Sequence, residues 1–278
     1  MSAPGRPKGE HGSVQREGTP MSSNALLQGR TAIVTGAGGG IGRGLALALA
    51  AQGANVVIAA RRASTGDETR ALVEAAGGRA LCVQTDVAQR PDVNRAVAAA
   101  IDTYGALDIV VHNASSGLSS QPTKCEEITD ALWDEQFGIA LDAAYHLAQA
   151  SFAHLRKSGR GRFIILSSAQ ALHGGAMNPV YASVKSAQRG MVKALAREWG
   201  PSAITVNAVA PASETDASKA YFERNPQFRA QIMATIPLRR MGDMQQDIGG
   251  AIVALCSDHM GFVTGQMLPV DGGAYTAL

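Results

Sequence analysis

The stretch TAIVTGAGGGIG, residues 31–42, decides the fold of this chain. Its first five residues are mostly β-branched or aliphatic, as in a buried strand, and an Ala- and Leu-rich helical stretch follows from Ile41 to Ala51. The glycines between them allow a tight turn and a close approach of the backbone to a ligand. Free N–H groups at the start of a helix favour negative charge. The stretch therefore predicts a strand, a turn and a helix that bind the pyrophosphate of a nucleotide.

The same alternation of short aliphatic runs and Ala-rich helical stretches continues to the end of the chain. Seven such runs predict strands at residues 31–35, 55–60, 80–85, 108–112, 163–167, 204–209 and 266–270. Repeated strand–helix–strand units require parallel strands, and a parallel sheet is covered on both faces. We expect a single α/β domain of the Rossmann type, with a doubly wound, seven-stranded parallel sheet and helices on both faces. Ligands then bind beyond the carboxyl ends of the strands.

Two segments fall outside the alternating pattern. Residues 1–24 are rich in Gly, Pro, Ser and mixed charge, which predicts a disordered tail, and Met21 is an alternative start of translation. The single α/β domain is accordingly expected to span residues 25–278. Residues 212–240 carry charges, two phenylalanines and two prolines. A connection this long in a compact domain is usually a lid or a binding loop, so we expect it to cover the substrate.

Composition argues against several classes of protein. The 278 residues carry a formal net charge of +2 without a dense basic stripe, so no nucleic-acid partner is expected. No run approaches the roughly 20 apolar residues that cross a bilayer, and no secretory signal is evident, which favours a cytoplasmic protein without a membrane span. Cys82, Cys125 and Cys256 lie far apart without metal-ligand spacing. We expect them to be reduced and buried, and we expect no metal site.

The glycine-rich turn supplies the first cofactor-binding candidates, which are Gly36, Gly38, Gly39, Gly40 and Ile41. The second strand ends in Arg61 and Arg62 rather than in the acidic residue that holds the ribose hydroxyls of NAD(H). Guanidinium groups suit the 2′-phosphate of NADP(H), so NADP(H) is predicted as the preferred cofactor. In the alternative, Asp67 or Glu68 folds back to the ribose and NAD(H) binds. Asp86, after the third strand, is either an acceptor for the adenine amino group or a turn residue.

Three residues provide candidate acid–base chemistry. Tyr181 and Lys185 are four residues apart, so a helix places them on one face. A free tyrosine is a poor acid or base at neutral pH, but a nearby lysine charge lowers the pKa of the phenol. Lys185 would also hold the nicotinamide ribose. Ser168 ends the fifth strand, where its hydroxyl would hydrogen-bond a substrate carbonyl and stabilise negative charge on its oxygen.

This combination of motifs resembles the classical short-chain dehydrogenase/reductase family, and 3-oxoacyl-reductase-like members in particular, over roughly residues 28–278. The Tyr-x-x-x-Lys pair, the serine thirteen residues upstream and the TGxxxGxG turn stand in register. The segments PLRRMGDMQQDI (237–248) and VTGQMLPVDGG (263–273) also look like family segments. The resemblance implies further cofactor-binding candidates, which are Val87, Asn113, Ala114, Tyr181, Lys185 and Pro211. The resemblance also implies a homotetramer or a homodimer.

Two departures from the family pattern concern residues beside the cofactor. Where the family has Asn-Asn-Ala-Gly after the fourth strand, this chain has His112-Asn113-Ala114-Ser115. The missing glycine alters the close approach of backbone to cofactor. The family's Pro-Gly after the sixth strand is Pro211-Ala212 here, a milder change, and the nicotinamide is still expected to fit.

A third departure lies in the helical stretch expected over residues 132–157. Ala140 occupies the place where the family has an asparagine that anchors a water in the proton relay to the lysine. Asp142 lies on roughly the opposite side of that helix and is a poor replacement. His112 is a candidate for the relay, but a structural role is favoured for a lone histidine at a strand end.

These residues predict an NADP(H)-dependent oxidoreductase whose partner is a small-molecule carbonyl or secondary alcohol. Hydride passes between the nicotinamide and the carbonyl carbon, Tyr181 transfers the proton of the oxygen, Ser168 positions that oxygen, and Lys185 tunes Tyr181. An alternative in another class is a nucleotide-bound binding or regulatory protein with little catalysis, favoured by Ala140, His112 and Ser115. A further alternative keeps the enzyme class but reduces a double bond or epimerises its substrate.

Overall fold

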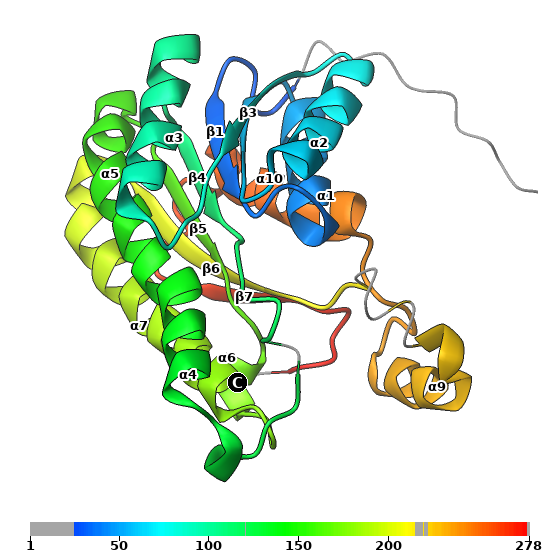
Figure 1. Ribbon diagram of the computed structural model, residues 1–278. Coiled ribbons are helices and arrows are strands. Elements are labelled where there is room, and N and C mark those ends of the chain that lie inside the picture. Colours follow the sequence, from blue (N-terminus) through cyan, green and yellow to red (C-terminus); the bar gives the residue numbers. More distant parts are fainter. Residues whose placement is uncertain (1–24, 120, 215–218, 220–221, 277–278) are drawn as a thin grey trace, which may run out of the picture.

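The structure is a computed structural model that describes residues 25–276 apart from 120, 215–218 and 220–221 (Figure 1). The tail predicted over residues 1–24 lies outside the described residues. Strands and helices alternate along the described chain, as the sequence pattern predicts. None of the described helices is long and apolar enough to cross a membrane.

Seven strands form one sheet in which all neighbours run parallel, in the order β3-β2-β1-β4-β5-β6-β7. The strands are β1 (Thr31–Thr35), β2 (Asn55–Ala60), β3 (Arg79–Gln84), β4 (Ile109–His112), β5 (Arg162–Leu166), β6 (Thr205–Pro211) and β7 (Met267–Val270). The predicted doubly wound parallel sheet is confirmed, with the bounds of β1 and β2 as predicted and those of the other strands shifted by up to two residues.

The strands are apolar on both faces because helices cover both faces of the sheet. Ala32 and Val34 of β1 belong to one buried cluster, whereas Ile33 between them belongs to a second cluster. Figure 1 shows α1, α2 and α10 on one side of the sheet and α3, α5 and α7 on the other. The bounds of these helices are α1 Gly40–Ala51, α2 Ala63–Ala75, α3 Arg90–Tyr104, α5 Ala143–Ser158, α7 Pro179–Trp199 and α10 Gly250–Cys256.

The strand order reverses at the centre of the sheet. β2 and β3 lie on one side of β1, and β4 and the later strands lie on the other. The connections that leave the carboxyl ends of β1 and β4 therefore turn in opposite directions, which opens a crevice for a ligand at this edge. The glycine-rich turn follows β1 at this position.

The helical stretch expected over residues 132–157 is not one uninterrupted α-helix. A π-helical turn, η2 (Gly138–Asp142), separates α4 (Asp130–Phe137) from α5. Inside the turn, the carbonyl oxygen of Ala140 accepts hydrogen bonds from the side chains of His112 and Gln188. Side chains that insert into the backbone hydrogen-bond ladder are a known cause of such irregularities.

The connection after β6 is partly helical. Pro226–Thr235 form α9, which stands away from the sheet in Figure 1. Ser213 pairs with Gly242 in an isolated β-bridge, which holds the two ends of the connection together. A lid role for residues 212–240 stays a prediction. Short turns complete the described chain: η1 (Cys125–Glu127), α6 (Gln170–His173), η3 (Gly200–Ser202), η4 (Met244–Gly249) and η5 (Asp258–Met260).

The cysteines differ from the expectation that all three are buried. Cys256 is buried, Cys82 is half-buried and Cys125 is exposed, and each is a free thiol. Cys125 lies in η1, a short turn on the surface, so no core position is available to it. Within the described part of the chain, no group of His, Cys, Asp or Glu side chains could hold a metal ion.

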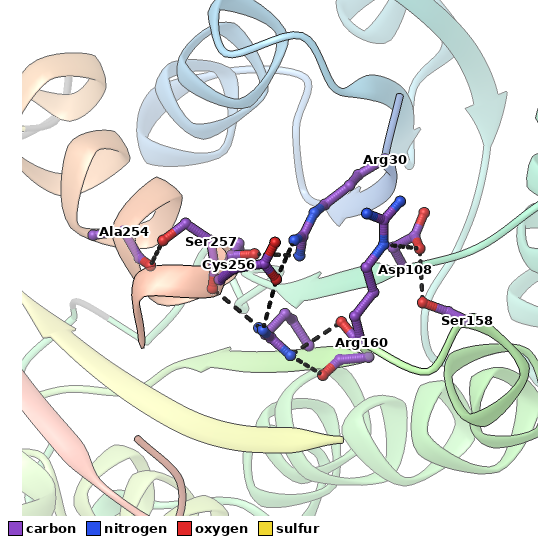
Figure 2. Close-up of polar contacts among 10 residues, drawn as sticks. Arg30, Asp108, Ser158, Arg160, Ala254, Cys256 and Ser257 are labelled. Atoms are coloured by element: carbon purple, nitrogen blue, oxygen red, sulfur yellow. Dashed lines mark hydrogen bonds and ion pairs between the residues drawn. The ribbon is translucent and has the colours of Figure 1, made fainter. Parts of the chain in front are cut away.

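A buried arginine cluster joins the amino ends of the strands, at the edge opposite the glycine-rich turn (Figure 2). Arg30, just before β1, donates to the carbonyl of Cys256 at 2.8 Å and to the carboxylate of Asp258 at 2.5 Å. Arg162, at the start of β5, donates to the carbonyl of Ser257 at 3.2 Å. Only one carboxylate, that of Asp258, pairs with these two guanidinium groups among the described residues.

Candidate active site

The glycine-rich turn and the segment after β4 pack as one unit. Gly36 has a φ of 65°, and a Cβ there would lie 2.9 Å from Cα of Ala114. A Cβ on Gly42 would overlap the carbonyl oxygen of Gly36 and lie 2.6 Å from Nδ2 of Asn113. That amide donates to the carbonyl of Thr35 at 3.0 Å and to the carbonyl of Gly36 at 3.3 Å. Predicted cofactor residues from two distant segments thus lie in contact, and side chains at Gly36 and Gly42 would separate them.

Two other glycines of the turn, Gly39 and Gly40, face open space. No heavy atom lies within 4 Å of a Cβ built on Gly39 or Gly40. α1 begins at Gly40, so its first N–H groups lie at this open side. A Cβ on Gly38 would lie 2.5 Å from Oγ1 of Thr65 in α2, and Ile41 packs against the first core cluster. The open backbone at Gly39 and Gly40 can accept an anionic group.

Arg61 and Arg62 follow β2, and both are exposed. No carboxylate forms an ion pair with either guanidinium in the part of the chain that the structure describes. The two acids of the NAD(H) alternative have other partners. Asp67 pairs with Arg70 at 3.2 Å, and Glu68 pairs with Arg43 at 2.9 Å.

Arg43 is a site residue that the sequence pattern does not reveal. Its Nη2 donates to the carbonyl of Gly38 at 2.8 Å, and its Nε donates to Oγ1 of Thr69 at 3.0 Å. Together with the ion pair to Glu68, these contacts join the glycine-rich turn to α2. The partners lie in two segments, the glycine-rich turn and α2, and α2 is about 25 residues further along the chain, so no local spacing predicts these contacts.

The remaining cofactor candidates lie at the carboxyl ends of β3 and β6. Oδ1 of Asp86 accepts the N–H of Ala88 at 3.1 Å, so Asp86 does act as a turn residue. Its own N–H donates to the carboxylate of Asp92 at 2.9 Å, which fixes the turn against α3. Val87 is buried, and Pro211 is the half-buried last residue of β6.

Ser168, Tyr181 and Lys185 lie together near the carboxyl end of β5. Nζ of Lys185 lies 5.5 Å from the ring centroid of Tyr181 and donates to the carbonyl of Leu166 at 2.7 Å. Oγ of Ser168 accepts the N–H of Gln170 at 3.2 Å. The hydroxyl proton of Ser168 is therefore left for another acceptor, and in this structure the phenol oxygen of Tyr181 is its partner.

Burial controls the ionisation of the tyrosine and the lysine. It raises the pKa of Tyr181, and a hydrogen bond with Ser168 offsets part of the rise. Burial also lowers the pKa of Lys185 to about 8. The expectation that Lys185 lowers the pKa of Tyr181 is not met in this structure. Burial is the larger cause of the shift, and the ammonium of Lys185 lies over the ring and donates to the carbonyl of Leu166.

Two of the positions that depart from the family pattern contact each other. Nε2 of His112 lies 2.9 Å from the carbonyl oxygen of Ala140, and Nδ1 lies 3.0 Å from Oγ1 of Thr35. Burial, and then the charge of Lys185, lower the pKa of His112 to about 4. Both ring nitrogens have partners and the ring stays neutral near pH 7, which agrees with a structural role. Gln188 joins this network from the face of α7 that carries Lys185, a spacing that the sequence does contain.

Comparisons with known proteins agree with this geometry. The family model described as enoyl-(acyl carrier protein) reductase matches residues 36–275. The chain is 35% identical over 247 residues to 2-dehydro-3-deoxy-D-gluconate 5-dehydrogenase of Bacillus subtilis (strain 168), which covers 89% of this chain and 95% of that relative.

Solved structures are similar over nearly the whole described chain. A 7α-hydroxysteroid dehydrogenase complexed with NADH and 7-oxo glycochenodeoxycholic acid has a TM-score of 0.84 at 31% identity, covering 92% of this chain and 98% of that one. A structure from Beutenbergia cavernae with NADP bound at low occupancy has a TM-score of 0.82 at 33% identity, covering 91% and 99%. By its motifs, its fold and these relatives, the chain belongs to the short-chain dehydrogenase/reductase family of oxidoreductases.

Proposed function

We propose that this protein is an NADP(H)-dependent oxidoreductase that interconverts a carbonyl and a secondary alcohol. The observation that carries the proposal is the grouping of Ser168, Tyr181 and Lys185 at the sheet edge where the glycine-rich turn is open. A hydroxyl, a phenol and an ammonium in this arrangement suit the oxygen of a carbonyl undergoing reduction.

The choice of NADP(H) rests on the residues after β2. Arg61 and Arg62 are exposed at the end of that strand, where a 2′-phosphate would lie, and Asp67 and Glu68 pair with other arginines. Similar solved structures hold NADH in one case and NADP in another, so we base the proposed preference on these local residues. The nicotinamide, when bound, supplies or accepts the hydride.

Each of the three grouped side chains has a distinct role. When substrate binds, Ser168 donates its hydroxyl proton to the carbonyl oxygen of the substrate in place of the phenol oxygen of Tyr181. The raised pKa of Tyr181 keeps the phenol protonated at neutral pH, so the phenol can give its proton to the oxygen during reduction. Lys185, with a pKa of about 8, is mostly charged at pH 7 and stabilises the phenolate that remains.

Paired fluorescence titrations with NADPH and NADH test the cofactor assignment. We expect NADPH to bind at least about tenfold more tightly, because a charge-assisted hydrogen bond contributes about 1.5–3 kcal/mol. The double variant Arg61→Ala/Arg62→Ala should lose this preference while keeping its affinity for NADH. Arg70→Ala is the matched control, since Arg70 lies on α2 and already pairs with Asp67 and Glu74. Tighter binding of NADH by the unaltered protein would contradict the assignment.

Turnover is tested by following NADPH consumption over a panel of ketones and aldehydes, with mass spectrometry of the products. Alcohol products support the proposal, whereas saturated or epimerised products assign another reaction to the same site. Tight NADPH binding without turnover of any compound would favour a nucleotide-bound binding protein.

We further propose that the protein is a homotetramer or a homodimer. Trp133 and Tyr145 expose 43% and 48% of their surface on α4 and α5, and α5 is rich in alanine and serine. Light scattering coupled to size exclusion measures the mass of the particle. A monomer at micromolar concentration would contradict this assignment.

A further inference from the structure

A buried chain of hydrogen bonds links the segment after β4 to the π turn. Oγ1 of Thr35 accepts the N–H of Asn113 at 3.0 Å and the N–H of Ala114 at 3.1 Å. The same oxygen lies 3.0 Å from Nδ1 of His112, whose Nε2 lies 2.9 Å from the carbonyl oxygen of Ala140. Thr35, His112 and Ala140 are each no more than 3% exposed, so water does not compete for these contacts.

The protonation of His112 follows from its partners. A carbonyl oxygen only accepts, so Nε2 carries the hydrogen and donates to Ala140. Both lone pairs of the Thr35 hydroxyl are filled by the two N–H groups, so that hydroxyl can only donate to Nδ1. A hydrogen on Nδ1 would face an oxygen with no lone pair left. The network therefore selects the neutral Nε2–H tautomer.

Gln188 completes the network from α7. Its Nε2 donates to the carbonyl oxygen of Ala140 at 2.9 Å, and its side chain is fully buried. Gln188 lies three residues after Lys185, on the same side of α7. His112 and Gln188 together fill both lone pairs of the Ala140 carbonyl, so this oxygen is not available to bind a water.

We propose that His112 is a positioning residue for the oxidoreductase site. It connects the segment Asn113–Ala114, which packs on the glycine-rich turn, to the π turn at Ala140 and, through Gln188, to the helix of Lys185. His112 contacts no reacting atom. It acts by fixing the distance between the cofactor-binding segment and Nζ of Lys185. The inference rests on the proposed function for its kinetic readout only.

Three substitutions separate the two contacts of the imidazole. His112→Asn places an acceptor near the position of Nδ1 and keeps the contact with Thr35, but it is too short to reach Ala140. His112→Gln places a donor near the position of Nε2 and keeps the contact with Ala140. His112→Leu fills the site and keeps neither. His146→Leu is the control, because His146 is a half-buried histidine of α5 outside this network.

The variants should separate cofactor affinity from turnover. We expect His112→Leu to lower kcat by about 10-fold to 100-fold and to weaken NADPH binding, since small displacements of catalytic groups reduce rates by such factors. His112→Asn should keep the affinity for NADPH and lose kcat, whereas His112→Gln should recover most of kcat. A structural role alone would lower both quantities together with the melting temperature. Unchanged kcat and NADPH affinity in His112→Leu would overturn the proposal.

A measurement without turnover keeps this inference separate from the proposed function. Long-range 1H–15N spectra of the histidine rings report directly which nitrogen carries hydrogen. We expect His112 to remain the Nε2–H tautomer from about pH 5.5 to about pH 9, whereas an unperturbed ring titrates near pH 6.5. An Nδ1–H tautomer, or titration near pH 6.5, would overturn the inference. If the wild type reduces no carbonyl, the proposed function fails, and the tautomer and the NADPH affinities of the variants still decide this inference. If His112→Leu does not fold, the other two variants carry the test.

Discussion

Tyr181 is the residue whose loss should separate chemistry from binding. Tyr181→Phe removes the phenol oxygen and leaves the ring beneath Nζ of Lys185. We expect kcat to fall by about 10²-fold to 10⁴-fold, the contribution of a general acid, with NADPH affinity within about twofold of wild type. NADPH consumption and fluorescence titration measure the two quantities. Tyr104→Phe is the control, because burial also raises the pKa of Tyr104, which lies in α3 away from the site. Wild-type turnover in Tyr181→Phe would remove the tyrosine from the mechanism.

His112 makes the stability of the fold depend on pH. Its pKa is about 4 in the folded chain, below the ordinary histidine value of 6.5, so the unfolded chain binds more protons between these values. The stabilisation is therefore complete above about pH 6.5 and is lost as the pH falls toward 4. The full loss amounts to about 3 kcal/mol.

Urea unfolding at several pH values between about 4.5 and 7.5 measures this dependence. His112→Asn has no titrating ring, so its free energy of unfolding should change less over that range than that of the wild type. His146→Asn is the control, because it removes a histidine of α5 that lies outside the His112 network. Equal pH dependence in wild type and His112→Asn would contradict the folded-state pKa.

At the scale of elements, the turn between β1 and α1 divides its glycines between packing and binding. A Cβ on Gly42 would meet the carbonyl of Gly36 and the amide of Asn113, whereas a Cβ on Gly39 meets no heavy atom within 4 Å. Gly42→Ala should therefore destabilise the fold by about 1–3 kcal/mol, as overpacking does. Gly39→Ala should leave stability within about 0.5 kcal/mol and weaken NADPH binding. Thermal melts and cofactor titrations on the pair distinguish the two roles. Similar losses of stability in both variants would contradict this division.

The strands follow from the sequence because their signal is local. A parallel strand covered on both faces needs a continuous apolar run, and TAIVT and RFIIL contain such runs, AIV and FIIL, within five residues. The π turn has no such local signal. It depends on His112 and Gln188, which lie 28 and 48 residues from Ala140 in sequence, so an Ala-rich stretch predicts an unbroken helix.

The site shows the same contrast. Ser168, Tyr181 and Lys185 stand at a spacing that predicts their meeting, and the structure brings them together. The predicted lowering of the pKa of Tyr181 was wrong. The spacing of the residues does not reveal that Tyr181 is buried, or that Lys185 donates to the carbonyl of Leu166. The contacts of Arg43 with the glycine-rich turn and α2 likewise exist only once the chain has folded.

At the scale of the whole molecule, contacts at the sheet edge opposite the site join the start of β1 to the segment after α10. Arg30 and Asp258 are 228 residues apart, so their contact joins the first strand to the segment before the last one. Figure 2 shows Arg30 directed toward the segment that contains Cys256 and Ser257. Burial, and then the charge of Arg30, lower the pKa of Arg162, which reflects two guanidinium groups held close together. The hydrogen bond from Arg30 lowers the pKa of Asp258.

Asp258→Asn should show how much the carboxylate that pairs with Arg30 and Arg162 contributes to the free energy of unfolding. It leaves two buried guanidinium groups without a counter-charge among the described residues, one at 2.5 Å and one at 3.7 Å from the lost charge. We expect the free energy of unfolding to fall by about 1–3 kcal/mol, less than for a wholly buried pair because the carboxylate itself is exposed. Glu74→Gln removes one carboxylate from the exposed pair with Arg70 and should cost much less, because water screens exposed ion pairs. Urea unfolding measures both, and NADPH affinity should remain unchanged because the cluster lies at the edge opposite the glycine-rich turn. If Asp258→Asn lost no more stability than Glu74→Gln, the carbonyls of Cys256 and Ser257 would be sufficient to hold the two arginines.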